Sequence, residues 1–203
     1  MRYWIILLFT FCSLWSLADG PVNIGIKYGT NSSVMMTNFD MVLNQNLQSD
    51  QINNHFAGAF LRLNAGSVYA QPEVYFNTKG GIIKPVNATE VPIPSATTFN
   101  YQSIDLPVLL GYKIINRDLI KFRLSLGPVF TFVTANSFYT EISNLNVNDL
   151  SKRYMGWQIG AGLDIWFITL DARIENSSNI LAPENQFIAK NRAYLLSVGI
   201  KLF

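Results

Sequence analysis

Residues 153–176 read Arg-Tyr-Met-Gly-Trp-Gln-Ile-Gly-Ala-Gly-Leu-Asp-Ile-Trp-Phe-Ile-Thr-Leu-Asp-Ala-Arg-Ile-Glu-Asn, and this stretch decides the fold class. Apolar residues recur at every second position from Met155 to Ile165 and again from Ile168 to Ile174. Glycine, amide, hydroxyl and charged residues lie between them. A period of two indicates extended strands whose side chains alternate between an apolar and a polar face. The sequence therefore predicts two adjacent strands joined by a short turn at Trp166-Phe167.

The composition fits one domain with a large apolar surface. The chain has 203 residues, of which 49% are hydrophobic and only 14% are charged, whereas soluble domains carry about a quarter of charged residues. The net charge of +2 is small and no run of Lys or Arg stands out, which argues against a nucleic-acid partner.

The first residues have the pattern of an export signal. A positive start at Met1-Arg2 and an apolar run precede Ser16-Leu17-Ala18, a small-x-small cleavage site. The apolar run is shorter than the roughly 20 residues that a membrane-spanning helix needs. We therefore expect a signal peptide at 1–18 and one domain at 19–203. Cleavage would remove Cys12, the only cysteine, and with it disulfides, thiol catalysis and cysteine metal sites.

Beyond the signal, the period of two predicts eight strands and no amphipathic helix. The expected strands are 22–29, 57–64, 68–77, 103–112, 121–132, 155–165, 168–175 and 194–202. Each has about the 9–12 residues that a tilted strand needs to cross a bilayer. Long polar connections at about 30–55, 78–100, 135–152 and 176–191 alternate with short turns at 64–66, 116–118 and 166–167. Long loops at one end and tight turns at the other are typical of outer-membrane barrels.

The charges decide which face points inward. A lipocalin-like soluble carrier would place the apolar face inside and would leave an outer wall rich in glycine. The apolar face carries no charge, as a lipid-facing wall requires, and the charges of both signs on the other face can pair inside a lumen. Eight strands leave room only for side chains, so Phe60, Tyr69 and Tyr75 should help to fill the interior. The predicted polar network of the lumen comprises Lys27, Arg62, Glu73, Asp105, Lys121, Arg123, Asp164, Asp171, Arg173, Glu175 and Lys201.

The prediction is thus an all-β protein: an eight-stranded antiparallel up-and-down transmembrane β-barrel of the bacterial outer membrane. Aromatic residues near the strand ends of the apolar face fit the girdles that such barrels carry at the membrane interfaces. They are Tyr28, Phe76, Tyr112, Phe122, Phe132, Trp157, Phe167 and Tyr194.

Several segments resemble the PorT-like outer-membrane β-barrel family across residues 20–203. They are Gln71-Pro72-Glu73-Val74 with Thr78-Lys79-Gly80-Gly81, then Ile104-Asp105-Leu106-Pro107-Val108-Leu109-Leu110, Gly127-Pro128, and Gln158-Ile159-Gly160-Ala161-Gly162-Leu163. The resemblance implies an eight-stranded barrel, recognition by the barrel-assembly machinery during biogenesis and, for a few members, a role in type IX secretion. Such barrels end on an outward-facing aromatic residue that serves as the assembly signal. Here Leu202 occupies the position that faces outward, and the aromatic residue Phe203 is one residue further.

The sequence offers little for catalysis or for a cofactor. His55 is the only histidine, and although Asp50, Ser32, Ser33 and Ser49 are near it in sequence, no motif surrounds them. We therefore expect no enzyme, no metal and no cofactor. The leading hypothesis is a structural or interaction protein that contacts outer-membrane lipid and a periplasmic or extracellular protein through its loops or turns. The alternatives are a transport or type IX secretion accessory barrel and a loop-borne enzyme.

Overall fold

The structure is a computed structural model that describes residues 20–37, 47–85, 97–139, 151–180 and 189–202. The predicted signal peptide at 1–18 and the assembly residue Phe203 lie outside these ranges. None of the described residues form a helix with the length and apolar character that a membrane crossing requires.

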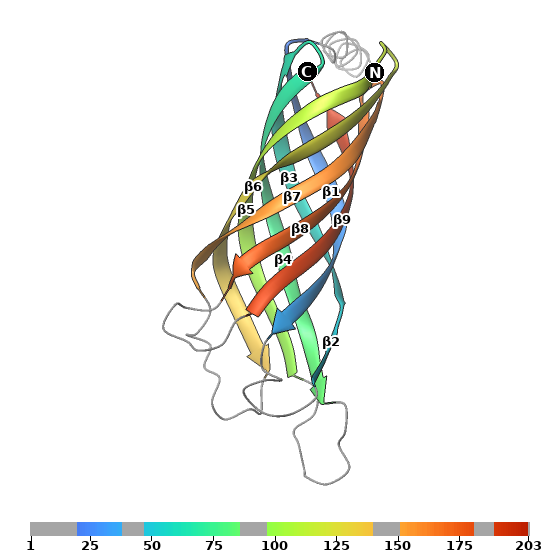
Figure 1. The fold of residues 1–203 in the computed structure, drawn as a ribbon. Coiled ribbons are helices and arrows are strands. Elements are labelled where there is room, and N and C mark those ends of the chain that lie inside the picture. Colours follow the sequence, from blue (N-terminus) through green and yellow to red (C-terminus); the bar gives the residue numbers. More distant parts are fainter. Residues whose placement is uncertain (1–19, 38–46, 86–96, 140–150, 181–188, 203) are drawn as a thin grey trace, which may run out of the picture.

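The strands form one closed antiparallel sheet (Figure 1). Neighbours run in the order β2-β4-β3-β1-β9-β8-β7-β6-β5, and pairing of β4 with β5 closes the cylinder. The short β2 and the longer β3 are separated only by Gln51 and both pair with β4. They therefore act as one interrupted strand, and the predicted eight-stranded barrel is confirmed. The strands are β1 (Val22–Thr37), β2 (Leu47–Asp50), β3 (Ile52–Ala65), β4 (Val68–Pro85), β5 (Thr97–Asn116), β6 (Ile120–Tyr139), β7 (Arg153–Ile165), β8 (Ile168–Asn179) and β9 (Ala189–Lys201).

All three predicted short turns lie at one end of the barrel, where the described chain also begins and ends (Figure 1). The turn after β3 contains Gly66 with φ of 64°, a left-handed conformation that glycine adopts at no steric cost. The turn after β7 places Trp166 at φ of 54°, which is unusual for a bulky residue. The Trp166 ring meets the Phe167 ring edge-on, with the ring centroids 4.6 Å apart.

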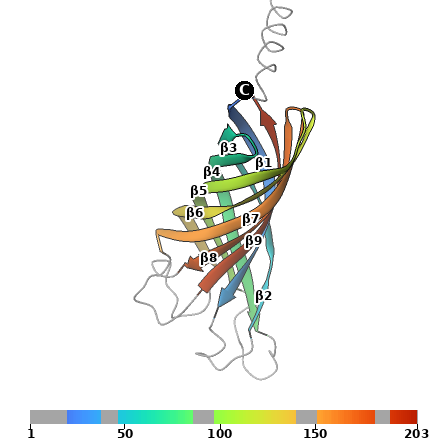
Figure 2. The ribbon, with the colours of Figure 1, turned by 45° about the horizontal axis from the view of Figure 1, so that its top comes forward.

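The strands are longer than the sequence pattern predicted. β5 and β6 each have 20 residues, so the predicted connections at 30–55, 78–100, 135–152 and 176–191 are wrong at their edges. Several outward residues toward the loop ends are polar, for example Thr30, Asn53 and Gln102, and this weakens the contrast between the two faces. Pairing with a neighbouring strand keeps these segments extended without that contrast. The barrel therefore continues beyond its apolar band. Its strands are long and tilted (Figure 2).

The wall has the predicted orientation. Outward side chains such as Phe76 and Leu110 are 66% and 65% exposed, whereas Arg62 and Arg123 on the lumen side are each 1% exposed. Inward glycines make room for inward rings: a Cβ added to Gly25 would lie 2.5 Å from the Phe60 ring. An apolar exterior and a polar interior are the reverse of a water-soluble barrel.

Candidate functional site

The lumen contains buried ion pairs, and the first group surrounds Glu73 and Asp171. Lys27 of β1 bridges the two carboxylates, with Nζ 2.8 Å from Glu73 and 2.6 Å from Asp171. Arg173 of β8 contacts the same two, at 2.5 Å from Glu73 and 3.6 Å from Asp171. Tyr75 also donates a hydrogen bond to Glu73. Strands on opposite sides of the barrel are thereby linked across its axis.

The second group surrounds Asp164 of β7, which pairs with the cations nearer the short turns. Arg62 approaches it at 2.6 Å, Arg123 at 2.8 Å and Lys201 at 4.0 Å. Arg123 also contacts Asp171 at 3.1 Å, which joins Asp164 to the Glu73–Asp171 group. We call the eight charged residues of these two groups the lower cluster. They are Lys27, Arg62, Glu73, Arg123, Asp164, Asp171, Arg173 and Lys201.

Toward the loop end, Lys79 of β4 is the cation of what we call the upper cluster, with Asp105 and Glu175. Its Nζ lies 2.9 Å from Asp105 and also pairs with Glu175. Gln158 donates to Glu175 at 2.8 Å and accepts from Arg173 at 3.4 Å. The amide therefore connects the two clusters. Asp105 accepts further bonds from Asn77, Ser103 and Thr131 at 2.9, 3.1 and 2.9 Å.

Ten of the eleven residues predicted for the lumen network are buried inside the barrel. Lys121 is the exception, because it is half-buried at the short-turn rim, where its Nζ donates to the Asp118 carbonyl at 3.5 Å. Sequence reasoning missed Lys79 and Lys113, both of which are buried. The alternation Glu73-Tyr75-Asn77 would have placed Lys79 inside if the strand had not been ended at residue 77.

The side chains of the network are buried in the lumen and paired with one another. Removing an ion from water costs several kcal/mol unless partners restore the lost solvation. Each carboxylate of the two clusters has at least one cation within 3 Å. Among the described residues, no group of three or more His, Cys, Asp or Glu side chains is placed to hold a metal ion. The arrangement can rigidify and seal the barrel, and its charges are already engaged with one another.

The residues near His55 do not meet as a catalytic set in the described part of the chain. His55 is exposed on the outer wall and stacks on Tyr28, with the ring centroids 5.8 Å apart. Ser32 donates to Gln51 at 2.9 Å. Ser33 points to the other face and donates to the Gly80 carbonyl at 2.9 Å. Asp50 is half-buried at the end of β2.

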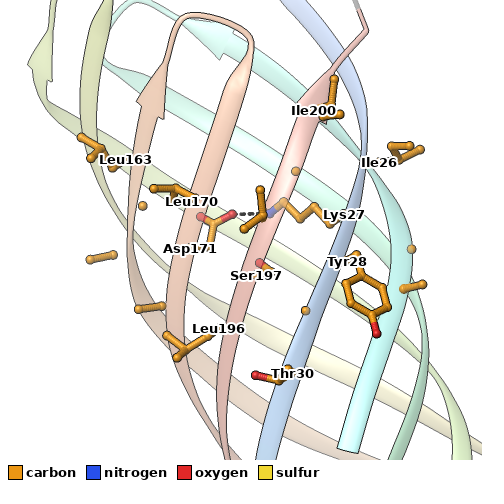
Figure 3. Close-up of a pocket in the computed structure, with 18 of the residues that line it drawn as sticks. Ile26, Lys27, Tyr28, Thr30, Leu163, Leu170, Asp171, Leu196, Ser197 and Ile200 are labelled. Atoms are coloured by element: carbon orange, nitrogen blue, oxygen red, sulfur yellow. Dashed lines mark ion pairs between the residues drawn. The ribbon is translucent and has the colours of Figure 1, made fainter.

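The outer wall carries an open apolar groove of about 1070 Å³ (Figure 3). Most of its lining comes from β1, β7, β8 and β9, and Ala57 and Gly58 of β3 and Phe122 of β6 also line it. Figure 3 shows the Lys27–Asp171 ion pair of the lower cluster in the same region. The lining includes small residues, among them Ala57, Ala161 and Ala172. It also includes larger outward side chains, namely Ile26, Tyr28, Leu163, Leu170, Leu196, Val198 and Ile200.

A closed antiparallel barrel with an apolar exterior, a charged and filled lumen and tight turns at one end is a small transmembrane barrel of the outer-membrane type. The sequence agrees: residues 16–177 match the model of a family described as outer membrane protein beta-barrel domain, and the chain belongs to that family. The predicted location is therefore confirmed, and the protein resides in the bacterial outer membrane.

The chain is similar to solved outer-membrane proteins at low sequence identity. OprG from Pseudomonas aeruginosa is 11% identical, with a TM-score of 0.51 over 88% of this chain and 95% of that chain. The Neisserial surface protein NspA is 12% identical, with a TM-score of 0.48 over 88% of this chain and 96% of that chain. Ail of Yersinia pestis, solved with a heparin analogue, is 12% identical, with a TM-score of 0.48 over 89% and 98%. No curated protein sequence matches the chain.

Proposed function

We propose that this protein is a sealed outer-membrane barrel that acts as a structural and interaction protein rather than as a channel or an enzyme. The observation that carries the proposal is the continuous polar network across the lumen. Lys27 of β1 and Arg123 of β6 contact Asp171 of β8, and Arg173 of β8 reaches Glu73 of β4. A solute passing along the axis would have to break several buried ion pairs at once, each of which costs about 3–5 kcal/mol to disrupt.

The loop end of the barrel supports a role outside the membrane. The apolar outer band of β5 reaches Ile104, and the seven residues 97–103 continue the strand beyond it. At about 3.3 Å per residue, this rim extends some 20 Å along the strand direction. A rigid rim that holds the loops away from the lipid surface favours contact with an extracellular partner.

Planar-bilayer recording tests the sealed lumen. The wild-type barrel should show no stable conductance steps, because the clusters fill the interior. The double variant Tyr69→Ala/Tyr75→Ala removes two fully buried inward rings and serves as the positive control for a detectable pore. Steady conductance of the wild-type barrel would favour the transport accessory instead.

Photo-cross-linking tests the interaction role and its side. A photoreactive residue at Asn53 on the loop-end outer wall should capture an extracellular partner, and one at Leu119 in a short turn should capture a periplasmic partner. Both positions are exposed. If neither captures a protein from intact cells in amounts above the unirradiated control, the interaction role is wrong.

We also propose that the chain is a PorT-like member of its family. The segments that carry the resemblance have roles within the barrel: Gln71 accepts from Arg62 at 2.5 Å and donates to Glu73, while Asp105 pairs with Lys79. These contacts give the motif residues a structural role within the barrel. The motifs by themselves therefore do not argue for a role in secretion. Deleting the gene and assaying type IX cargo in the culture medium tests that role, and unchanged secretion is expected.

A further inference from the structure

The apolar groove and the charges beyond it lie on the same strands of the outer wall. Along β9, the outward residues Leu196, Val198 and Ile200 line the groove, and Tyr194 follows toward the loop end. Arg192 comes next on the same face, four residues from Leu196. At about 3.3 Å per residue, this separation is about 13 Å along the strand.

Within the part of β7, β8 and β9 that the structure describes, the outward charges at this height are all positive. Arg192 is half-exposed, and its Nε donates to Asn176 of β8 at 2.8 Å, which holds the guanidinium against the wall. Lys190 of β9 and Arg153 of β7 are exposed nearby on the same three-stranded wall. Among the described residues of β7, β8 and β9, every carboxylate points into the lumen and none lies on the outer face.

An apolar groove below a band of cations is complementary to a lipid that carries both acyl chains and phosphate. Basic residues at the edge of the hydrocarbon attract anionic headgroups, and amphipathic rings such as that of Tyr194 favour this interface. The loop end of an outer-membrane barrel faces the outside. The occupant is therefore a lipid of the outer leaflet.

We propose that the outer wall of β1, β7, β8 and β9 is a binding site for a phosphate-bearing acyl lipid of the outer leaflet. Arg153, Lys190 and Arg192 hold the phosphate, and the groove over Ala161 and Ala172 holds an acyl chain. The small side chains of these alanines leave the space that the chain fills. The site is independent of the sealed lumen and of any protein partner.

Native mass spectrometry of the whole barrel, released from a neutral detergent, tests the headgroup half of the site. The probes are a bisphosphorylated acyl glucosamine disaccharide (lipid A) and the same lipid without its phosphates. The wild type should bind the phosphorylated lipid more tightly. The triple variant Arg153→Gln/Lys190→Gln/Arg192→Gln should lose that preference, by about fivefold for each cation removed. Arg117→Gln, at the short-turn end, is the matched control and should bind like the wild type.

The acyl half is tested by Ala172→Phe, which fills the groove and should weaken binding of both lipids. Ala70→Phe, on the outer face of β4 and away from the groove, is its control. Heat-dependent gel mobility verifies that each variant is folded. The proposal is overturned if the triple variant keeps the phosphate preference or if Ala172→Phe binds both lipids normally. A third outcome also overturns it: the wild-type barrel binds no lipid and instead forms dimers, and Ala172→Phe abolishes those dimers.

Discussion

Removing a carboxylate from the lower cluster should destabilise the barrel more than removing a cation from the same ion pair. Within the described residues, this cluster holds five cations and three carboxylates. Asp171→Asn leaves Lys27, Arg123 and Arg173 to share the remaining carboxylates. Breaking a buried pair in this way costs about 3–5 kcal/mol. Lys27→Met instead brings the two signs closer to balance, and both its former partners keep an arginine.

The expected cost of Lys27→Met is therefore the loss of charge-assisted hydrogen bonds, about 1.5–3 kcal/mol. Equilibrium urea unfolding in detergent micelles, followed by tryptophan fluorescence, gives both free energies of unfolding. Asp118→Asn in an exposed turn is the control and should stay within about 0.5 kcal/mol of the wild type. The charge argument is refuted if Lys27→Met costs as much as Asp171→Asn or more.

Two further substitutions test the rest of the interior by the same unfolding measurement. Lys79→Met leaves Asp105 and Glu175 without their shared cation and should lower the free energy of unfolding by about 3–5 kcal/mol. The control, Lys121→Met at the half-exposed rim, should lower it by less than about 0.5 kcal/mol. Equal losses of free energy in the two variants would mean that the upper cluster contributes no net stability. Gly58→Ala places a methyl group against the Val74 carbonyl and the Tyr75 ring. This overpacking should lower the free energy of unfolding by about 1–3 kcal/mol. An unchanged unfolding midpoint would contradict the close approach of β3 and β4.

The orientation of the wall could be predicted from the sequence because lipid accepts no charge. From Asp164 to Glu175, every charged residue falls on the face opposite the apolar set, and the structure buries all four of these charges in the lumen. Parity alone therefore identified which residues face inward. The turn at Trp166-Phe167 was also predicted, because the phase of the apolar residues changes there even though no glycine or asparagine marks it.

The extent of the strands could not be predicted in the same way. Outside the bilayer, the outer face of a strand meets water, so polar side chains occupy both faces and the period of two disappears. Lys79 was missed for this reason, since it lies beyond the last apolar outward residue that marked its strand. The short β2 was missed because its pairing with β4, not its own side chains, makes it a strand.

The pairing of individual charges also lay beyond the sequence. Arg173 and Glu73 are separated by 100 residues, and their contact at 2.5 Å depends on the stagger of strands around the whole barrel. The nearly equal numbers of positive and negative residues predicted for the lumen indicated that each charge could find a partner of opposite sign. Only the closed geometry determines which partner each cation meets.

The most direct test of the account is spin-label accessibility along β9. Single cysteines at positions 194–201, introduced into residues 19–203, which contain no cysteine, would carry nitroxide labels in lipid vesicles. Collisions with dissolved oxygen, which partitions into lipid, should be frequent at Tyr194, Leu196, Val198 and Ile200 and rare at Leu195, Ser197, Gly199 and Lys201. Accessibility with the opposite phase, or with no alternation at all, would contradict a barrel whose apolar face meets the membrane and whose charges lie within.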